Sequence, residues 1–129
     1  MSAKPCVYGL IGYPLSHSFS PAYFARKFER EGIEDALYRA FPLERIELFA
    51  ELEHNQPHLR GLNVTLPYKQ AIIPWLSELS PEAEAVGAVN TLEYLGPGCW
   101  RGHNTDVLGF RLAFLRLLGE RDLLPRALI

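Results

Sequence analysis

Apolar residues in this chain fall into short unbroken runs and into stretches with helical spacing, separated by glycine and proline. Residues 6–11 form a nearly continuous apolar run that ends at Gly12, a pattern typical of a strand buried on both faces of a sheet. We expect further strands at residues 36–41 and 62–66. Residues 89–94 and 99–102, joined by the turn-forming Leu95-Gly96-Pro97-Gly98, are predicted to form an antiparallel hairpin.

Helical signals fill the segments between these strands. Ser20-Pro21 supplies a capping residue and a first helical position for a helix over residues 22–31, and Gly32 can end it in the left-handed conformation. The longest predicted helix covers residues 106–118, with Asn104-Thr105 as its capping candidates. The other helices are predicted at residues 43–53, 68–76 with a break at Pro74, and 80–86.

Strands that alternate with helices predict an α/β layer fold. We expect a mixed, mainly parallel sheet with helices on both faces, and a chain of 129 residues is long enough for one hydrophobic core. The last residues, Ala127-Leu128-Ile129, have the character of a strand that is just beginning.

Composition and charge exclude several classes of protein. Hydrophobic residues make up 48% of the chain and charged residues 22%, which is ordinary for a globular domain. The net charge of -2 gives no basic surface for a nucleic acid, and no apolar run is long enough for a membrane span. The two cysteines and four histidines lack the spacing of a metal site, and no signal peptide is recognisable, so we expect a cytoplasmic protein without a metal.

Four short segments combine polar residues with glycine or proline, and in an alternating fold such segments tend to lie at the strand ends where α/β proteins bind ligands. In the first, Ser16 and Ser18 stand shortly before a helix N-terminus, so their hydroxyls could bind a small carboxylate. The alternative is that these serines only complete loop hydrogen bonds, and for Ser20 we expect a capping role. In the second segment, Asn63 and Thr65 point to the same side of a strand and Lys69 follows closely.

The third segment is Gly87-Ala88-Val89-Asn90-Thr91 and the fourth is Gly102-His103-Asn104-Thr105-Asp106-Val107-Leu108-Gly109. Together with Asn63-Val64-Thr65-Leu66-Pro67-Tyr68-Lys69, they resemble the motifs of the shikimate dehydrogenase family, in the order in which that family has them. The resemblance implies an oxidoreductase of the shikimate pathway, which leads to chorismate and the aromatic amino acids. Such an enzyme interconverts shikimate and 3-dehydroshikimate with NADP(H).

The resemblance also implies roles for individual residues. Ser16, Ser18 and Thr65 would bind the substrate carboxylate, and the ring hydroxyls would be bound by Asn63, Asn90, Lys69 and Asp106. Lys69 and Asp106 would form the catalytic pair, because reduction of a ring ketone leaves an oxygen that needs a proton donor.

The family pattern continues beyond this chain into a glycine-rich turn and an NADP-binding domain. The resemblance therefore divides the chain into a shikimate-binding domain, residues 1–103, and residues 104–129, which would be a connecting helix and the first strand of an absent cofactor domain. We expect that this chain alone binds no NADP, is inactive, and self-associates through its apolar last helix.

Two other functions remain open. A quinate or quinate/shikimate dehydrogenase belongs to the same family and accepts an additional ring hydroxyl, although the paired Ser16 and Ser18 favour shikimate. A non-catalytic shikimate-binding domain would keep the pocket without the redox half. The presence of both Lys69 and Asp106 favours an enzyme.

Overall fold

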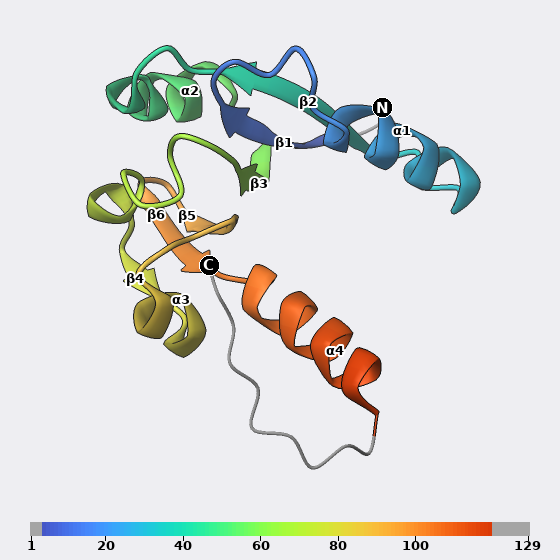
Figure 1. Cartoon of the computed structure of the whole chain (residues 1–129). Coiled ribbons are helices and arrows are strands. Elements are labelled where there is room, and N and C mark those ends of the chain that lie inside the picture. Colours follow the sequence, from blue (N-terminus) through green and yellow to red (C-terminus); the bar gives the residue numbers. More distant parts are fainter. Residues whose placement is uncertain (1–3, 120–129) are drawn as a thin grey trace.

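The computed structural model describes residues 4–119 as a six-stranded sheet with helices on both sides (Figure 1). Its elements are, in chain order, β1 (Cys6–Gly12), α1 (Ser20–Arg30), β2 (Ala36–Pro42), the 3-10 turn η1 (Ile46–Leu48), α2 (Phe49–Asn55), β3 (Leu59–Val64), the 3-10 turn η2 (Ile73–Trp75), β4 (Glu78–Leu79), α3 (Pro81–Val86), β5 (Thr91–Gly96), β6 (Cys99–His103) and α4 (Asp106–Leu118).

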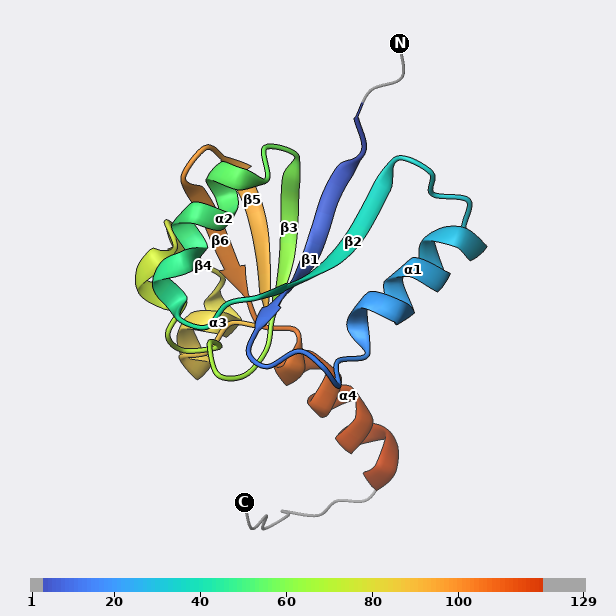
Figure 2. The ribbon, with the colours of Figure 1, turned by 90° about the horizontal axis from the view of Figure 1, so that it is seen from above.

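The strands follow the order β2-β1-β3-β5-β6-β4 across the sheet. β1 runs parallel to β2 and β3, and β4 runs parallel to β6, whereas β5 is antiparallel to both of its neighbours. The predicted mixed, mainly parallel α/β sheet is therefore confirmed, as is the hairpin of β5 and β6. Figure 2 shows β2 at one edge of the sheet, with β1 and then β3 beside it.

One face of the sheet carries most of the hydrophobic core. Alternate residues of the strands point to this face, among them Ile11, Leu62 and Trp100, each at most 3% exposed. Helices α2 and α3 cover it, and Phe49 and Ala83 contribute to the same buried cluster. On the opposite face α1 packs its aromatic side chains against β1 and β2, and α4 emerges further along this side (Figure 1).

Three predicted elements differ in the structure. The third strand is Leu59–Val64 rather than residues 62–66, because Gly61 packs beneath the ring of Tyr8 and so belongs to the sheet, although Arg60 and Gly61 interrupt the apolar run. The helix predicted at residues 43–53 begins later and is divided between η1 and α2.

The helix predicted at residues 68–76 is wrong. Pro74 has no N–H to donate and is tolerated only in the first turn of a helix, and here it stands in the first turn of the short η2. The amide of Ser77 then donates to the Trp100 carbonyl at 2.9 Å, which draws the chain into the sheet as β4.

The other elements agree with the sequence. The strands β1 and β2, the helix α3 and the long helix α4 lie where they were expected. The strand expected at residues 127–129 lies outside the described residues. Between residues 4 and 119 no helix is long and apolar enough to cross a membrane, and no group of three side chains could hold a metal ion.

Candidate active site at the carboxyl edge of the sheet

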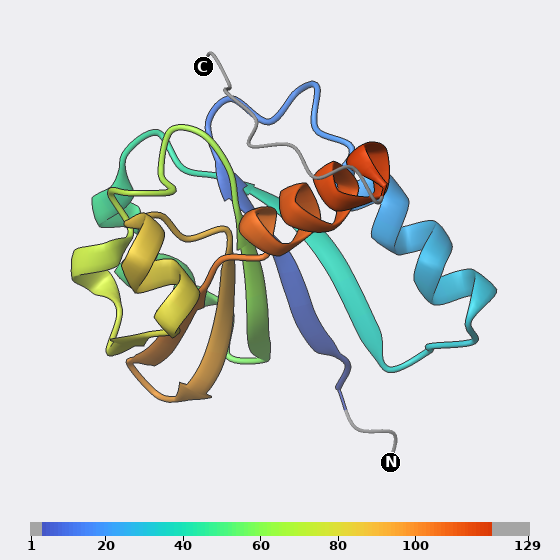
Figure 3. The same cartoon turned by 60° about the horizontal axis from the view of Figure 1, so that its bottom comes forward.

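The predicted site segments meet at one edge of the sheet. The loops that follow β1 and β3, the start of β5 and the link from β6 to α4 all lie there, because β5 and β6 are antiparallel and Asn63, Thr91 and His103 are paired across neighbouring strands. Figure 3 shows the loops after β1 and β3 at the same edge as the beginning of α4. This edge is where open α/β sheets commonly bind ligands.

Lys69 and Asp106, the expected catalytic pair, are in direct contact. The Lys69 Nζ donates to Asp106 Oδ2 at 2.7 Å, although the residues lie 37 positions apart in the sequence. The side chains are 32% and 56% exposed, so the pair opens to solvent and is accessible to a small molecule. The main chain supports this placement, since the Val89 amide donates to the Lys69 carbonyl at 2.7 Å.

Asn90 is held by residues on both sides of it. Its Nδ2 donates to the Thr105 hydroxyl at 2.8 Å, and its Oδ1 accepts from the Thr105 amide at 2.9 Å and from the Thr91 hydroxyl at 3.0 Å. These bonds fasten the start of α4 to the start of β5. Thr105, which the sequence suggested only as a helix cap, is therefore a polar neighbour of the site, and its side chain does not cap α4.

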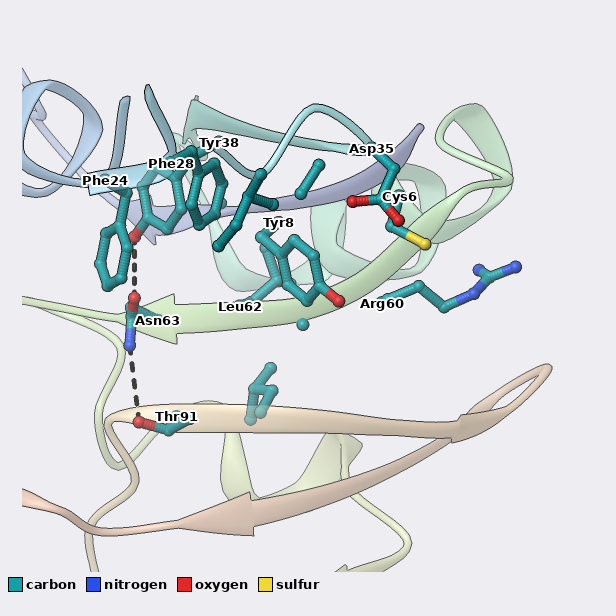
Figure 4. A pocket seen from close by; sticks show the side chains of 15 residues that line it. Cys6, Tyr8, Phe24, Phe28, Asp35, Tyr38, Arg60, Leu62, Asn63 and Thr91 are labelled. Carbon is teal, nitrogen blue, oxygen red and sulfur yellow. Dashed lines mark hydrogen bonds between the residues drawn. The ribbon is translucent and has the colours of Figure 1, made fainter. Parts of the chain in front are cut away.

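Asn63 is oriented by a tyrosine that sequence reasoning did not select. The Tyr38 hydroxyl donates to Asn63 Oδ1 at 2.8 Å, and Asn63 Nδ2 lies 3.5 Å from the Thr91 hydroxyl (Figure 4). Tyr38 also stacks on the ring of Phe24, with centroids 4.4 Å apart. With its carbonyl oxygen bonded to Tyr38, Asn63 directs its amide nitrogen toward Thr91.

Burial raises the pKa of Tyr38 to about 12, although a hydrogen bond with Ser20 acts in the opposite direction. The folded chain therefore keeps the phenol proton at a pH where the unfolded chain has lost it. This contribution to stability is complete below about pH 10, the ordinary pKa of tyrosine. It is lost as the pH rises toward about 12.

We expect Tyr38→Phe to remove this late titration. Absorbance of the phenolate during an alkaline titration should show one late-titrating tyrosine fewer, and thermal unfolding should lose less stability between about pH 10 and about pH 12 than in the parent chain. Tyr23→Phe, at a tyrosine that is 56% exposed, should keep the late titration and should lose as much stability at high pH as the parent chain. Identical curves for the parent and Tyr38→Phe would contradict the assignment.

The remaining predicted residues lie in or beside the β1–α1 loop. The Thr65 methyl group packs against Gly12, where an added Cβ would come within 2.5 Å of it, and the Tyr13 amide donates to the Leu66 carbonyl at 3.1 Å. The loop is thereby held beside the segment that follows β3. Ser16 is exposed and Ser18 is half-buried. Within residues 4–119 no hydrogen bond joins either side chain to the other site residues.

Ser20 lies close to the predicted site, although the sequence analysis gave it only a capping role. Helix α1 begins at Ser20 itself, and its N-cap is Phe19, which makes no side-chain capping bond, so the predicted capping role of Ser20 is wrong. The Ser20 side chain instead lies near Tyr38, the partner of Asn63, where it acts to lower the pKa of that phenol. The pairs Ser16/Ser18 and Ser18/Ser20 have the same spacing in the sequence, and only the position of α1 distinguishes them.

A largely apolar groove of about 490 Å³ adjoins the site on the face that carries α1 (Figure 4). Its walls include Tyr8, Phe24 and Phe28, and Asn63 and Thr91 lie at one end. Lys69 and Asp106 do not line it. The groove is therefore a neighbour of the lysine–aspartate pair and does not enclose it.

The described residues do not fit a dinucleotide cofactor. A phosphate cradle needs a glycine-rich turn between a strand and a helix, where the backbone approaches the pyrophosphate closely. In the β1–α1 connection the space beside Gly12 is filled by the methyl group of Thr65, and Tyr13-Pro14 follows this glycine.

Fold and site together define an α/β small-molecule-binding domain that presents a lysine–carboxylate pair at one edge of its sheet. The chain belongs to the family of the shikimate dehydrogenase substrate binding domain, whose sequence model matches residues 10–92.

Relatives and solved structures agree with this family. A shikimate dehydrogenase (NADP(+)) of Oleidesulfovibrio alaskensis is 48% identical over 106 residues, which make up 81% of this chain and 37% of the relative. A Thermus thermophilus shikimate 5-dehydrogenase in complex with NADP(H) and shikimate has a TM-score of 0.74 and 38% identity, over 88% of this chain and 42% of that one. The chain therefore spans less than half the length of these proteins.

A quinate dehydrogenase of Corynebacterium glutamicum in complex with NAD has a similar fold. Its TM-score is 0.78 at 32% identity, over 94% of this chain and 45% of that one.

Proposed function

We propose that this chain is the substrate-binding part of an NADP-dependent shikimate dehydrogenase, which reversibly reduces 3-dehydroshikimate to shikimate. The observation that carries the proposal is the 2.7 Å contact between Lys69 Nζ and Asp106 Oδ2 at the sheet edge, beside Asn90 and Asn63. The family of the chain and the printed activity of its curated relatives support the same reaction. NADPH supplies the hydride when it is bound elsewhere in the longer protein.

Lys69 donates the proton that the ring oxygen needs. Its ammonium is the one donor of the pair, and Asp106 orients that ammonium and accepts a hydrogen bond from a neighbouring ring hydroxyl. Asn63 and Asn90 bind further hydroxyls. The Asn63 amide is directed by Tyr38, and Asn90 is directed by Thr105.

The substrate carboxylate is bound at the β1–α1 loop by Ser18 and Thr65, together with either Ser16 or Ser20. The sequence favours Ser16, whereas the contact of Ser20 with Tyr38 favours Ser20. Single alanine variants at these two positions separate the choices, because only the serine that binds the carboxylate should raise KM for shikimate when it is removed.

Joining residues 1–119 to the cofactor-binding part of the Oleidesulfovibrio relative gives a protein in which the reaction can be measured. We expect it to reduce NADP(+) with shikimate and to do so faster than with quinate. Faster turnover of quinate would instead identify the chain with the Corynebacterium enzyme, whose fold it shares. Binding of shikimate without turnover of shikimate or quinate would instead support a non-catalytic binding domain.

We also propose that residues 1–103 form the shikimate-binding domain and that residues 104–129 lead into the cofactor domain. The exposure of α4 supports this division, because none of its residues is buried among the described part of the chain. A cytoplasmic location fits a family of enzymes whose relatives use NADP(+). Cell fractionation tests the location.

Helix α4 is expected to drive self-association of this chain. Leu108, Leu112 and Leu115 form one stripe and are 57%, 56% and 53% exposed, so they offer an apolar surface that water disfavours. Leu112→Glu should lower the average mass measured by light scattering at high concentration. Leu95→Glu, at a leucine of the β-hairpin that is 43% exposed, should leave the mass unchanged. A parent chain that is monomeric at all concentrations would exclude this prediction.

A further inference from the structure

Asn104 is the buried polar side chain of the core. It is 8% exposed, and among residues 4–119 it is the one polar or charged residue in the buried class. A buried carboxamide is tolerated only where its donor and acceptor groups find partners. Those partners indicate what the residue does for the site.

The two ends of the Asn104 carboxamide hold two different elements. Its Oδ1 accepts from the Val107 amide at 3.0 Å and so caps the first turn of α4. Its Nδ2 donates to the Ala88 carbonyl at 3.0 Å. The first bond caps the helix, and the second ties the helix start to the loop that connects α3 with β5.

The same loop holds Lys69. The residue after Ala88 is Val89, which is fully buried and whose amide donates to the Lys69 carbonyl at 2.7 Å. The dipeptide Ala88-Val89 therefore binds the Lys69 backbone through its N–H group and the Asn104 side chain through its C=O group. Gly87 precedes it with a φ of 72°, a left-handed conformation that ends α3 and that glycine adopts at little cost.

Helix α4 has little other support. Apart from the bonds between Asn90 and Thr105, the described contacts of its start are those of Asn104 and the lysine–aspartate pair, and its side chains are largely exposed. The position of the first turn of α4, which carries Asp106, therefore depends on few hydrogen bonds.

We infer that Asn104 is a positioning residue: by bonding Ala88 on one side and Val107 on the other, it sets Asp106 against Lys69. This inference rests on the proposed function for its catalytic meaning, but the geometry can be tested in this chain alone.

Zero-length coupling with a water-soluble carbodiimide reports the geometry directly. The reagent activates the Asp106 carboxyl as an O-acylisourea, the Lys69 amine attacks the carbonyl carbon, and an amide forms while the reagent leaves as its urea, which carries away the elements of one water. Because the two groups are in contact, the intramolecular reaction is strongly favoured over attack by other amines. Digestion and mass spectrometry quantify the cross-linked peptide, and Asp106→Asn must abolish it.

In Asn104→Ser the serine hydroxyl can still cap α4. The shorter side chain cannot reach the Ala88 carbonyl, so the bond to Ala88 is lost. We expect its yield of the Lys69–Asp106 cross-link to fall several-fold. Asn104→Asp also keeps an acceptor for the Val107 amide and loses the donor to Ala88. Its yield of the cross-link should fall as well. Ser80→Ala is the matched control, because it removes the cap bond of α3, from the Ala83 amide to the Ser80 hydroxyl at 3.2 Å, without touching Asp106.

The circular dichroism spectrum first establishes that each variant is folded. An unchanged cross-link in a folded Asn104→Ser chain overturns the positioning role, and so does an equal loss in Ser80→Ala. In the protein joined to a cofactor-binding part, loss of the cross-link should accompany a lower kcat for shikimate, with KM much less affected. Loss of the cross-link with unchanged kcat would keep the positioning role and reject the catalytic pair of the proposed function.

Discussion

Lys69→Met in the protein joined to a cofactor-binding part should reduce kcat for shikimate by roughly 10²- to 10⁴-fold, the usual contribution of a positioned proton donor or acceptor. Methionine keeps the length of the side chain and removes the ammonium that donates to Asp106 at 2.7 Å. The pair is partly exposed, so its loss should change stability little. Steady-state kinetics with shikimate and NADP(+) measures the effect.

Lys27→Met is the matched control. Lys27 Nζ donates to Glu31 at 2.8 Å, and its side chain is 35% exposed, close to the 32% of Lys69. The two substitutions therefore remove similar ion pairs, one in the site and one on α1. A similar loss of kcat in both variants would show that a surface ion pair matters generally and would reject Lys69 as the proton donor.

Trp100→Ala should destabilise the domain by about 3–5 kcal/mol, the usual cost of truncating a large buried aromatic residue. Trp100 is 1% exposed, and its ring packs edge-on against Phe49 and Tyr94. Its indole N–H donates to Glu53 Oε2 at 3.1 Å, so the substitution also removes a partner of that carboxylate. Because single domains are stable by only about 5–15 kcal/mol, this loss is a large fraction of the total stability. The variant should therefore unfold at a lower temperature than the parent chain. Urea denaturation followed by circular dichroism gives the difference.

Trp75→Ala is the comparison, because Trp75 lies in η2 and is 37% exposed. We expect a much smaller loss of stability for this variant than for Trp100→Ala. Equal losses would mean that the buried cluster around Trp100 does not dominate the stability of the domain.

Periodicity in the sequence was sufficient for the elements whose local signals agree. The apolar run of β1, the turn between β5 and β6, and the capped helices α3 and α4 lie where the pattern predicted them. Where proline and glycine interrupted the pattern, the predictions were wrong at Pro74 and shifted at Gly61. In these places pairing with a neighbouring strand overrode the local signal.

The candidate site was likewise predictable only in part from the sequence. Lys69 and Asp106 were selected as the catalytic pair from motifs, because the residue types, their order and their resemblance to a family are properties of the sequence. Their contact depends on the tertiary structure, since the dipeptide Ala88-Val89 holds one partner directly and the other through Asn104.

Sequence alone therefore determined the fold class and the family, and it selected the residues that we propose for proton transfer. Only the tertiary structure decided that Tyr38 bonds Asn63, that Ser20 does not cap α1, and that Asn104 bonds both Ala88 and Val107. The physical reason is that a hydrogen bond between distant segments depends on strand register and helix start. Both are fixed by packing across the whole sheet and leave no local pattern in the chain.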